Sequence, residues 1–217
     1  MGLGLQRIDL ADDLQMRAIN SYRQADLPEV PTLWIELAGS EAAVAHDLDL
    51  LTELMRDGGA SRIELAQSPD DAKRLWRIRH DALYAARALR PGIKGLSTDV
   101  CVPISRLAEC ISAIKAEIAQ TDLLAPLVGH VGDGNFHLVL LFDPTDPDET
   151  ATGRRISQRL VEMALSLDGT STGEHGVGLD KKSYMAAEHG PALGLMRRLK
   201  QAVDPKGIMN PGKIFDT

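Results

Sequence analysis

The chain has 217 residues, of which 44% are hydrophobic, and this is enough to bury a core in one large domain or two small ones. Its net charge is −7, from 24 basic and 31 acidic residues, which disfavours a general binder of nucleic acid or anionic membranes. No apolar run approaches the roughly 20 residues of a membrane span, and residues 1–13 lack the pattern of a secretory signal. Because Cys101 and Cys110 offer no disulfide framework, we expect a cytoplasmic protein.

Hydrophobic periodicity and capping residues predict an alternation of strands and helices. Ser40 is a helix cap, the Gly58-Gly59 pair ends that helix, and Ser68-Pro69 begins the next. In chain order, the pattern predicts a strand at 31–37, a helix over 40–58, a strand at 61–66, a helix over 68–89, a strand at 98–103, a helix over 107–118, strands at 127–131 and 136–142, and a helix over 148–167.

Two further short helices are expected after the glycine-rich residues 173–178. Short helices between non-adjacent strands, with one tight hairpin, indicate an antiparallel or mixed α+β layer rather than a Rossmann sheet. We expect a single domain over residues 1–217, built as an antiparallel, ferredoxin-like sheet covered by helices, with a C-terminal helical segment.

A basic cluster lies between Lys73 and Lys94, where seven cations are opposed only by Asp81. Arg79 stands out because its neighbours at helical spacing are mostly apolar, and an arginine on an apolar face must find an anion. These neighbours are Leu75, Trp76, Ala82 and Leu83. Two interpretations stay open: an ion pair with a core acid or a snorkelling side chain, and a fork for a substrate carboxylate. The helix alone favours the first.

The segment HVGDGNFH (130–137) carries two histidines around a turn. Asp133-Gly134 is a preferred two-residue hairpin turn, which would place His130 directly opposite His137, with Cβ atoms roughly 4.5–5.5 Å apart. Two imidazoles at that separation can bind one metal ion at about 2.0–2.1 Å. A longer loop would change the pairing, and a lone histidine on a strand usually has only a structural role.

The segment at 173–178 places Glu174 and His175 among three glycines, which suggests a backbone packed close to a neighbour. It differs from the dinucleotide motif and follows no clear strand, so a phosphate-binding loop is weakly supported. Glu174 could complete a three-ligand metal site with His130 and His137, leaving His175 as an acid–base group. An exposed loop with two incidental polar residues is the alternative.

Four segments resemble a known family: TDVCVPISRL (98–107), HVGDGNFH (130–137), TGEHGVG (172–178) and DPKGIMNPGKIF (204–215). They are similar to the C-terminal substrate or cap region of FAD-linked 2-hydroxy acid dehydrogenases. The most similar branch is the cytochrome-linked D-lactate dehydrogenases, with glycolate oxidase and D-2-hydroxyglutarate dehydrogenase as relatives. The resemblance covers residues 11–215 and implies that an N-terminal domain for the FAD pyrophosphate is absent. The chain would then be a fragment, a split subunit or a standalone relative.

The resemblance also implies roles for six residues. It assigns a divalent metal, Zn or Mn, to His130, His137 and Glu174, the catalytic base to His175, the substrate carboxylate to Arg79, and a position near the flavin to Asn210. The implied reaction oxidises D-lactate or a similar D-2-hydroxy acid to the 2-oxo acid, with hydride transfer to FAD.

We expect the isolated chain to be inactive. Its expected partners are a small 2-hydroxy acid, an FAD-domain chain, and an electron acceptor that could bring the protein to a membrane surface. A metal- or carboxylate-binding module that lacks FAD and has no activity is the alternative function.

Overall fold

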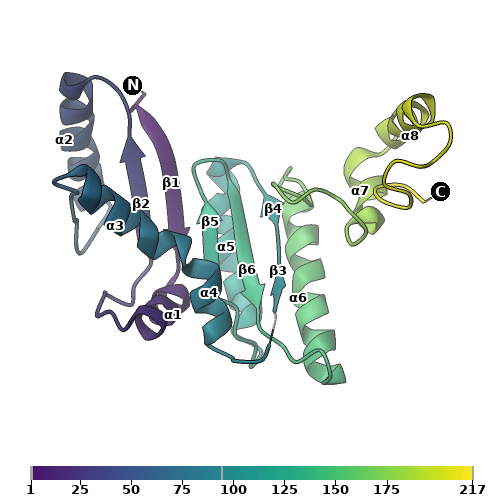
Figure 1. The fold of residues 1–217 in the computed structure, drawn as a ribbon, viewed down its shortest axis with the longest axis horizontal. Helices are drawn as coiled ribbons and strands as arrows, with labels where there is room; N and C mark the ends of the chain where they lie inside the picture. Colours follow the sequence, from purple (N-terminus) through teal and green to yellow (C-terminus); the bar gives the residue numbers. More distant parts are fainter. Residues whose placement is uncertain (1, 94, 217) are drawn as a thin grey trace.

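The structure, a computed structural model, describes residues 2–93 and 95–216, so Lys94 of the basic cluster lies outside the described residues. Its strands form one antiparallel sheet in the order β2-β1-β5-β6-β3, with β4 also paired to β6 (Figure 1). The strands are β1 (Leu5–Ala11), β2 (Thr32–Leu37), β3 (Leu96–Ser97), β4 (Val100–Cys101), β5 (Leu127–His130) and β6 (Asn135–Leu140). The helices are α1 (Asp13–Arg23), α2 (Glu41–Asp57), α3 (Pro69–His80), α4 (Ala82–Ala88), α5 (Ile104–Ile118), α6 (Pro147–Ser166), η1 (Lys182–Tyr184), α7 (Met185–His189) and α8 (Ala192–Val203).

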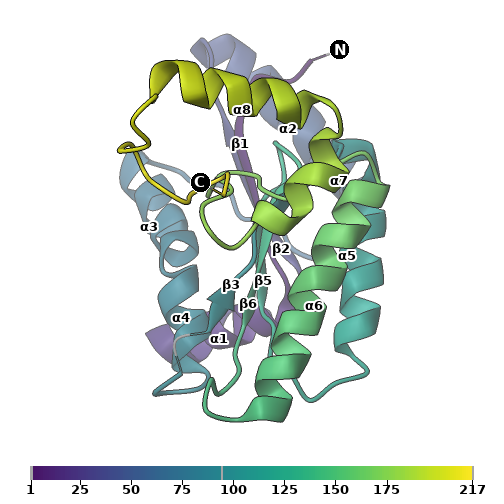
Figure 2. The ribbon, with the colours of Figure 1, turned by 90° about the vertical axis from the view of Figure 1, so that its right-hand side faces the viewer.

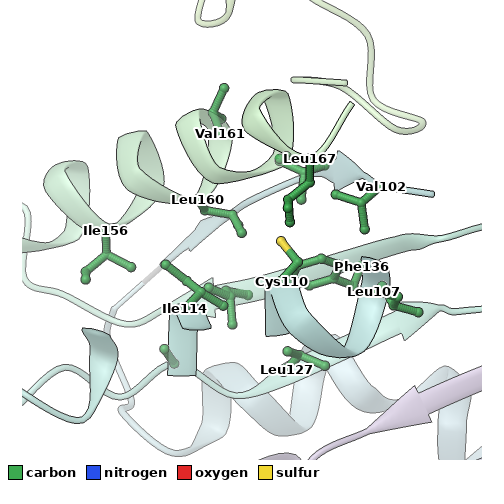
Figure 3. Packing of buried hydrophobic residues seen from close by; sticks show 14 of the residues in the cluster. Val102, Leu107, Cys110, Ile114, Leu127, Phe136, Ile156, Leu160, Val161 and Leu167 are labelled. Carbon is green, nitrogen blue, oxygen red and sulfur yellow. The ribbon is translucent and has the colours of Figure 1, made fainter. Parts of the chain in front are cut away.

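Helices cover both faces of the sheet, with α5 and α6 on one side and α1, α3 and α4 on the other (Figure 2). Side chains of β6 alternate between these faces, because successive residues of a strand point to opposite sides. Phe136 and Leu138 enter the larger core, where Ile114 of α5 and Leu160 of α6 pack against them (Figure 3). His137 and Val139 point to the side of α4.

The α+β class, with an antiparallel sheet covered by helices, is confirmed. The expected C-terminal helical segment is present as η1, α7 and α8, which lie beyond α6 on the side away from β2 (Figure 1). None of the helices in the described parts of the chain combines the length and apolar character needed to cross a bilayer.

Several predicted elements are wrong or incomplete. Residues 61–66 form no strand; they lie in a mostly exposed connection, where an alternating pattern has neither a partner strand nor a core to cover. The predicted helix over 68–89 is broken at Asp81, whose carboxylate binds Arg23 of α1, and Arg23 also donates to the main-chain oxygen of Arg77. Of the predicted strand at 98–103, only β4 (Val100–Cys101) is formed, and β3 (Leu96–Ser97) precedes it. β1 and α1 were not predicted from the sequence.

The hairpin of β5 and β6 has a different turn from the one predicted. Its loop has four residues, 131–134, and pairs His130 with Asn135 and Val128 with His137. The register is therefore displaced by two residues, and a displacement of two keeps every side chain on its original face. His130 and His137 remain neighbours, with ring centroids 6.0 Å apart.

Candidate metal and substrate site

One face of the sheet carries the polar side chains of the candidate site. The strand registers pair Ala11 with Val128, and Val128 with His137, so alternation puts Asp9 and His130 on the same face as His137. A cavity of about 580 Å³ opens over this face, between β1, α3 and the β5–β6 loop. Its polar lining includes Asp9, Arg79, His130, Asn135 and Glu174.

The ring of His137 is held in one tautomer by the strand pairing around Thr98. The main-chain N–H of Leu138 donates to the Thr98 hydroxyl at 2.8 Å, and the Thr98 main-chain carbonyl accepts instead from Nδ1 of His137 at 2.9 Å. A carbonyl oxygen can only accept, so Nδ1 carries the proton and the lone pair of the neutral ring lies on Nε2. Burial lowers the pKa of His137, which favours the neutral ring.

Glu174 faces this unprotonated nitrogen. Its Oε1 atom lies 3.1 Å from Nε2 of His137. Both atoms carry lone pairs, so their approach is unfavourable unless a proton or a metal cation lies between them. The lowered pKa of His137 disfavours the proton. A divalent cation fits this arrangement, because imidazole nitrogen and carboxylate oxygen are common zinc ligands.

His130 completes the group from the neighbouring strand. Its Nδ1 lies 3.0 Å from Oδ1 of Asp9, and this hydrogen bond raises the pKa of His130. One ligand atom from each of His130, His137 and Glu174 lies within 4.8 Å of the others. Two imidazoles and one carboxylate are a ligand set that catalytic zinc sites use while keeping one position open. The structure therefore brings the three predicted ligands together.

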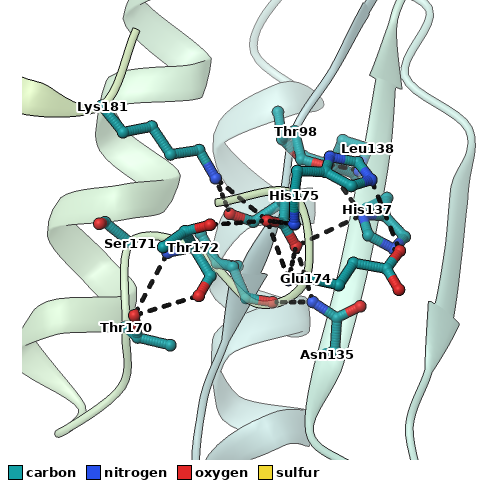
Figure 4. A network of polar contacts seen from close by, with 12 residues as sticks. Thr98, Asn135, His137, Leu138, Thr170, Ser171, Thr172, Glu174, His175 and Lys181 are labelled. Carbon is teal, nitrogen blue, oxygen red and sulfur yellow. Dashed lines mark hydrogen bonds and ion pairs between the residues drawn. The ribbon is translucent and has the colours of Figure 1, made fainter. Parts of the chain in front are cut away.

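The loop that carries Glu174 and His175 is tied down by a buried carboxylate. Asp99, only 2% exposed, accepts hydrogen bonds from the main-chain N–H groups of Glu174 and His175 at 3.1 and 2.9 Å. Figure 4 labels these two donor residues. Asp99 also accepts from the side chains of Asn135, Thr172 and Lys181. Burial alone would raise the pKa of Asp99, but these hydrogen bonds and the charge of Lys181 hold it well below its usual range.

Close packing explains why residue 173, the first of the 173–178 segment, is a glycine. A Cβ atom on Gly173 would lie 1.8 Å from Nδ2 of Asn135 and 2.8 Å from Oδ1 of Asp99, so a larger residue does not fit. Gly176 and Gly178 have open space around them and instead adopt positive φ angles of 78° and 54°. The expected close approach is therefore confirmed for Gly173 alone.

A second group of possible ligands, Asp99, His137 and His175, is also compact. It is poorly suited to a metal, because both oxygens of Asp99 already accept hydrogen bonds and Nδ1 of His137 is bound to Thr98. The His175 ring stacks on His137, with centroids 5.1 Å apart and an interplanar angle of 12°. Its side chain is 49% exposed and its Nε2 lies 3.5 Å from Oε1 of Glu174, so His175 lies directly beside the first ligand group.

Arg79 makes the internal ion pair that the helix pattern favoured. It is buried in α3, and its Nε lies 2.9 Å from Oδ2 of Asp9, without the alignment of a good hydrogen bond. Burial lowers the pKa of Arg79, and the charges of Asp9 and Glu174 oppose that shift. Among the described residues, none accepts a hydrogen bond from the Nη groups of Arg79, although Arg79 lines the cavity. The ion pair thus leaves the outer edge of the guanidinium available to a ligand.

The structure does not bring Asn210 to this site. Asn210 lies in a C-terminal turn, where its Oδ1 accepts from Lys213 at 3.2 Å, and it is not among the residues lining the cavity. Three further polar residues of the site were not predicted from the sequence: Asp9, Asp99 and Asn135. An acid within a predicted buried strand is a signal that could have identified Asp99, whereas Asp9 lies on a strand that was not predicted.

The chain matches the family model described as FAD linked oxidases, C-terminal domain, over residues 1–214. It is 43% identical to the protein named "Probable D-lactate dehydrogenase, mitochondrial" of Danio rerio, over 99% of this chain and 44% of the relative. It is 42% identical to "D-lactate dehydrogenase [cytochrome], mitochondrial" of Arabidopsis thaliana, over 99% of this chain and 38% of the relative. A glycolate oxidase subunit and a D-2-hydroxyglutarate dehydrogenase also match, as the resemblance implied. The chain thus spans less than half the length of these relatives.

A solved structure of p-cresol methylhydroxylase with bound substrate shares the fold, with a TM-score of 0.61 over 96% of this chain and 46% of that chain. The sequence identity is only 16%, so this likeness concerns the fold alone.

The expectation of a cytoplasmic protein is wrong, because the matched D-lactate dehydrogenases are named as mitochondrial. That expectation rested partly on residues 1–13. Because the chain spans only 44% of the Danio rerio relative, its first residues give no information about a targeting segment.

The sequence motifs, the fold and the family match over residues 1–214 agree, and the chain belongs to the C-terminal domain family of FAD-linked oxidases.

Proposed function

We propose that this chain is the substrate- and metal-binding part of a flavin-dependent dehydrogenase that oxidises D-lactate or a similar D-2-hydroxy acid to the 2-oxo acid. The observation that carries the proposal is the close approach of His137 Nε2 and Glu174 Oε1, two atoms with lone pairs, beside a cavity that Arg79 also lines. A 2-hydroxy acid offers a hydroxyl for a Lewis acid beside a carboxylate for a guanidinium. The names of the matched D-lactate dehydrogenases support this substrate class and a mitochondrial location.

Each residue of the candidate site has a separate role in the proposed reaction. When bound, a divalent metal, Zn²⁺ or Mn²⁺, on His130, His137 and Glu174 supplies the charge that lowers the pKa of a nearby hydroxyl, and FAD supplies the hydride acceptor. Arg79 binds and orients the substrate carboxylate through its Nη groups. His175 accepts the hydroxyl proton on a ring nitrogen, and its stacking on His137 keeps it beside the reacting group.

The charges around the cavity favour a substrate with one carboxylate. Arg79 is neutralised by Asp9, and Lys181 by Asp99, so Glu174 is the uncompensated charge among the proposed ligands, and Asp133 adds an exposed negative charge to the cavity lining. A divalent cation makes the ligand group positive by one charge, and a single carboxylate balances it. A second carboxylate would add to the negative charge of Asp133.

Thermal unfolding of the metal-loaded chain tests the proposed substrate class. D-lactate at about ten times its Kd should stabilise the fold by about 1.4 kcal/mol, or a few degrees in Tm. L-lactate should protect less, because with its hydroxyl and carboxylate on the same two partners its methyl group takes the place that the C2 hydrogen has in D-lactate. Equal protection by the two enantiomers, or none by either, would contradict a site for D-2-hydroxy acids and leave a metal-binding module.

We propose further that FAD is held outside this chain, by another domain or a partner chain that also connects to the electron acceptor. The glycine-rich segment at 173–178 follows no strand and leads into the short helix η1, so it lacks the strand-to-helix geometry that binds a pyrophosphate. Calorimetric titration of the pure chain with FAD should show no binding, and a micromolar Kd would contradict this part of the proposal.

A further inference from the structure

Asp9 is a buried carboxylate, and a buried carboxylate needs cations or hydrogen-bond donors beside it. It lies on β1 and is only 6% exposed. The register of β1 and β5, which pairs Leu10 with Gly129, brings Asp9 alongside His130 on the neighbouring strand. A buried carboxylate is costly unless donors compensate it, and the partners of Asp9 are two residues of the candidate site.

Each oxygen of Asp9 serves one of these residues. Oδ1 lies 3.0 Å from Nδ1 of His130, and Oδ2 lies 2.9 Å from Nε of Arg79. An ionised carboxylate can only accept, so Nδ1 of His130 carries a proton. The lone pair of the neutral ring is then on Nε2, the nitrogen that remains for a metal.

We propose that Asp9 is a positioning residue that sets two parts of the site at once: it fixes the His130 tautomer needed for metal binding, and it anchors the guanidinium of Arg79. This inference rests on the proposed function. It adds that binding of the metal and binding of the substrate carboxylate both depend on Asp9, which is assigned neither as a metal ligand nor as a substrate-binding residue.

The Asp9→Asn variant tests this role directly, because it removes one of the two acceptor oxygens of residue 9. Asp9 faces the Arg79 cation with one oxygen and the Nδ1–H of His130 with the other, whereas an asparagine offers only one acceptor oxygen. The cation attracts that oxygen more strongly, which turns the amide NH₂ toward Nδ1 of His130. An NH₂ group needs an acceptor, so the ring changes to the Nε2–H tautomer, in which the metal-binding nitrogen is blocked.

The test uses the 217-residue chain labelled with ¹⁵N-histidine, at pH 8 and without metal. Long-range ¹H–¹⁵N spectra report the tautomer, and the His130 signals are assigned by their loss in His130→Gln. We expect the Nδ1–H tautomer in the wild type and the Nε2–H tautomer in Asp9→Asn. Asp133→Asn is the matched control, because Asp133 is an exposed acid lining the same cavity, and it should keep the wild-type tautomer.

Zn²⁺ affinity, measured by competition with a chromophoric chelator, is the second readout. Asp9→Asn should weaken Zn²⁺ binding by about 10- to 100-fold and should also abolish protection by D-lactate, whereas Asp133→Asn should keep both. Asp9→Glu retains two acceptor oxygens and should restore the Nδ1–H tautomer. A purely structural role would lower Tm in Asp9→Asn without changing either the tautomer or the Zn²⁺ affinity.

The outcomes separate this inference from the proposed function. A wild-type chain that binds no Zn²⁺ would overturn the proposed function, while the tautomer spectra would still decide the positioning role of Asp9. An Nε2–H tautomer in the wild type would overturn that role without any variant, even if Asp9→Asn fails to fold. An unchanged tautomer in a folded Asp9→Asn chain would overturn it as well.

Discussion

The main-chain carbonyl of Thr98 is available to Nδ1 of His137 because the hydroxyl of the same threonine has taken its place in the strand pairing. In a regular antiparallel pair, Thr98 and Leu138 would exchange two main-chain hydrogen bonds. Here one of the two goes to the Thr98 hydroxyl at 2.8 Å, and the carbonyl accepts from His137 at 2.9 Å. The interruption between β3 and β4 thus has a chemical consequence, since it orients a candidate metal ligand.

Replacing Thr98 with valine should undo this arrangement. Without the hydroxyl, the N–H of Leu138 needs the Thr98 carbonyl, and His137 loses the acceptor that fixes its tautomer. We expect unfolding to become easier by about 1–2 kcal/mol and Zn²⁺ affinity to fall about tenfold, measured by urea unfolding and chelator competition. Thr98→Ser keeps the hydroxyl and should behave like the wild type. Wild-type Zn²⁺ affinity in Thr98→Val would show that the carbonyl does not orient His137.

Asp99 should dominate the acid sensitivity of the fold. Its pKa in the folded chain is below the ordinary value of 3.8, so its contribution to stability is present above that pH and is lost as the pH falls further. Asp99→Asn should cost about 3 kcal/mol at pH 7, because buried donors lose their charged acceptor. Urea unfolding from pH 7 to pH 3 should show the gap between variant and wild type narrowing below about pH 4. A gap that stays constant would contradict the assignment.

Gly173 should tolerate no side chain. A Cβ atom there would overlap Nδ2 of Asn135 at 1.8 Å, so the loop must move, which typically costs about 1–3 kcal/mol. Because Glu174 is the next residue, Gly173→Ala should also lose bound Zn²⁺ by elemental analysis. Gly176→Ala is the matched control: its positive φ costs about 1 kcal/mol, but its surroundings are open, and the metal should remain. Full Zn²⁺ occupancy in Gly173→Ala would mean that this contact does not position Glu174.

Arg79→Lys separates the two functions of one side chain. The single ammonium of lysine can keep the ion pair with Asp9, but it cannot also offer the two Nη groups to a ligand. Because lysine keeps the charge, we expect the baseline free energy of unfolding to change by less than the roughly 3–5 kcal/mol that removal of one partner of a buried ion pair costs, and the protection by D-lactate to disappear, measured by thermal unfolding with saturating Zn²⁺. Protection equal to that of the wild type would move the carboxylate site to another residue.

The sequence predicted the layers of the fold and most members of the site, because both depend on local patterns. Apolar stripes placed α5 and α6, and the histidines around the β5–β6 turn remained on one face although the predicted register was wrong by two residues. An error of one residue would have separated them. The face of a strand is thus easier to predict than its register.

The residues that connect the site could not be predicted, because their partners are distant in the chain. Asp9 meets His130 across 121 positions, and Asp99 meets His175 across 76. Such contacts depend on which strands are neighbours, and β1 was not among the predicted strands. For the same reason, the sequence left the ion pair and the substrate fork as competing interpretations of Arg79, whereas the structure allows both at once.

The most direct measurement is diffraction at the zinc absorption edge, from crystals of the chain grown with Zn²⁺. We expect one strong anomalous peak within about 2.0–2.2 Å of a ring nitrogen of His130, a ring nitrogen of His137 and a carboxylate oxygen of Glu174. A peak on Asp99 and His175 instead, or no peak among these side chains at saturating Zn²⁺, would contradict the metal site on which the proposed function depends.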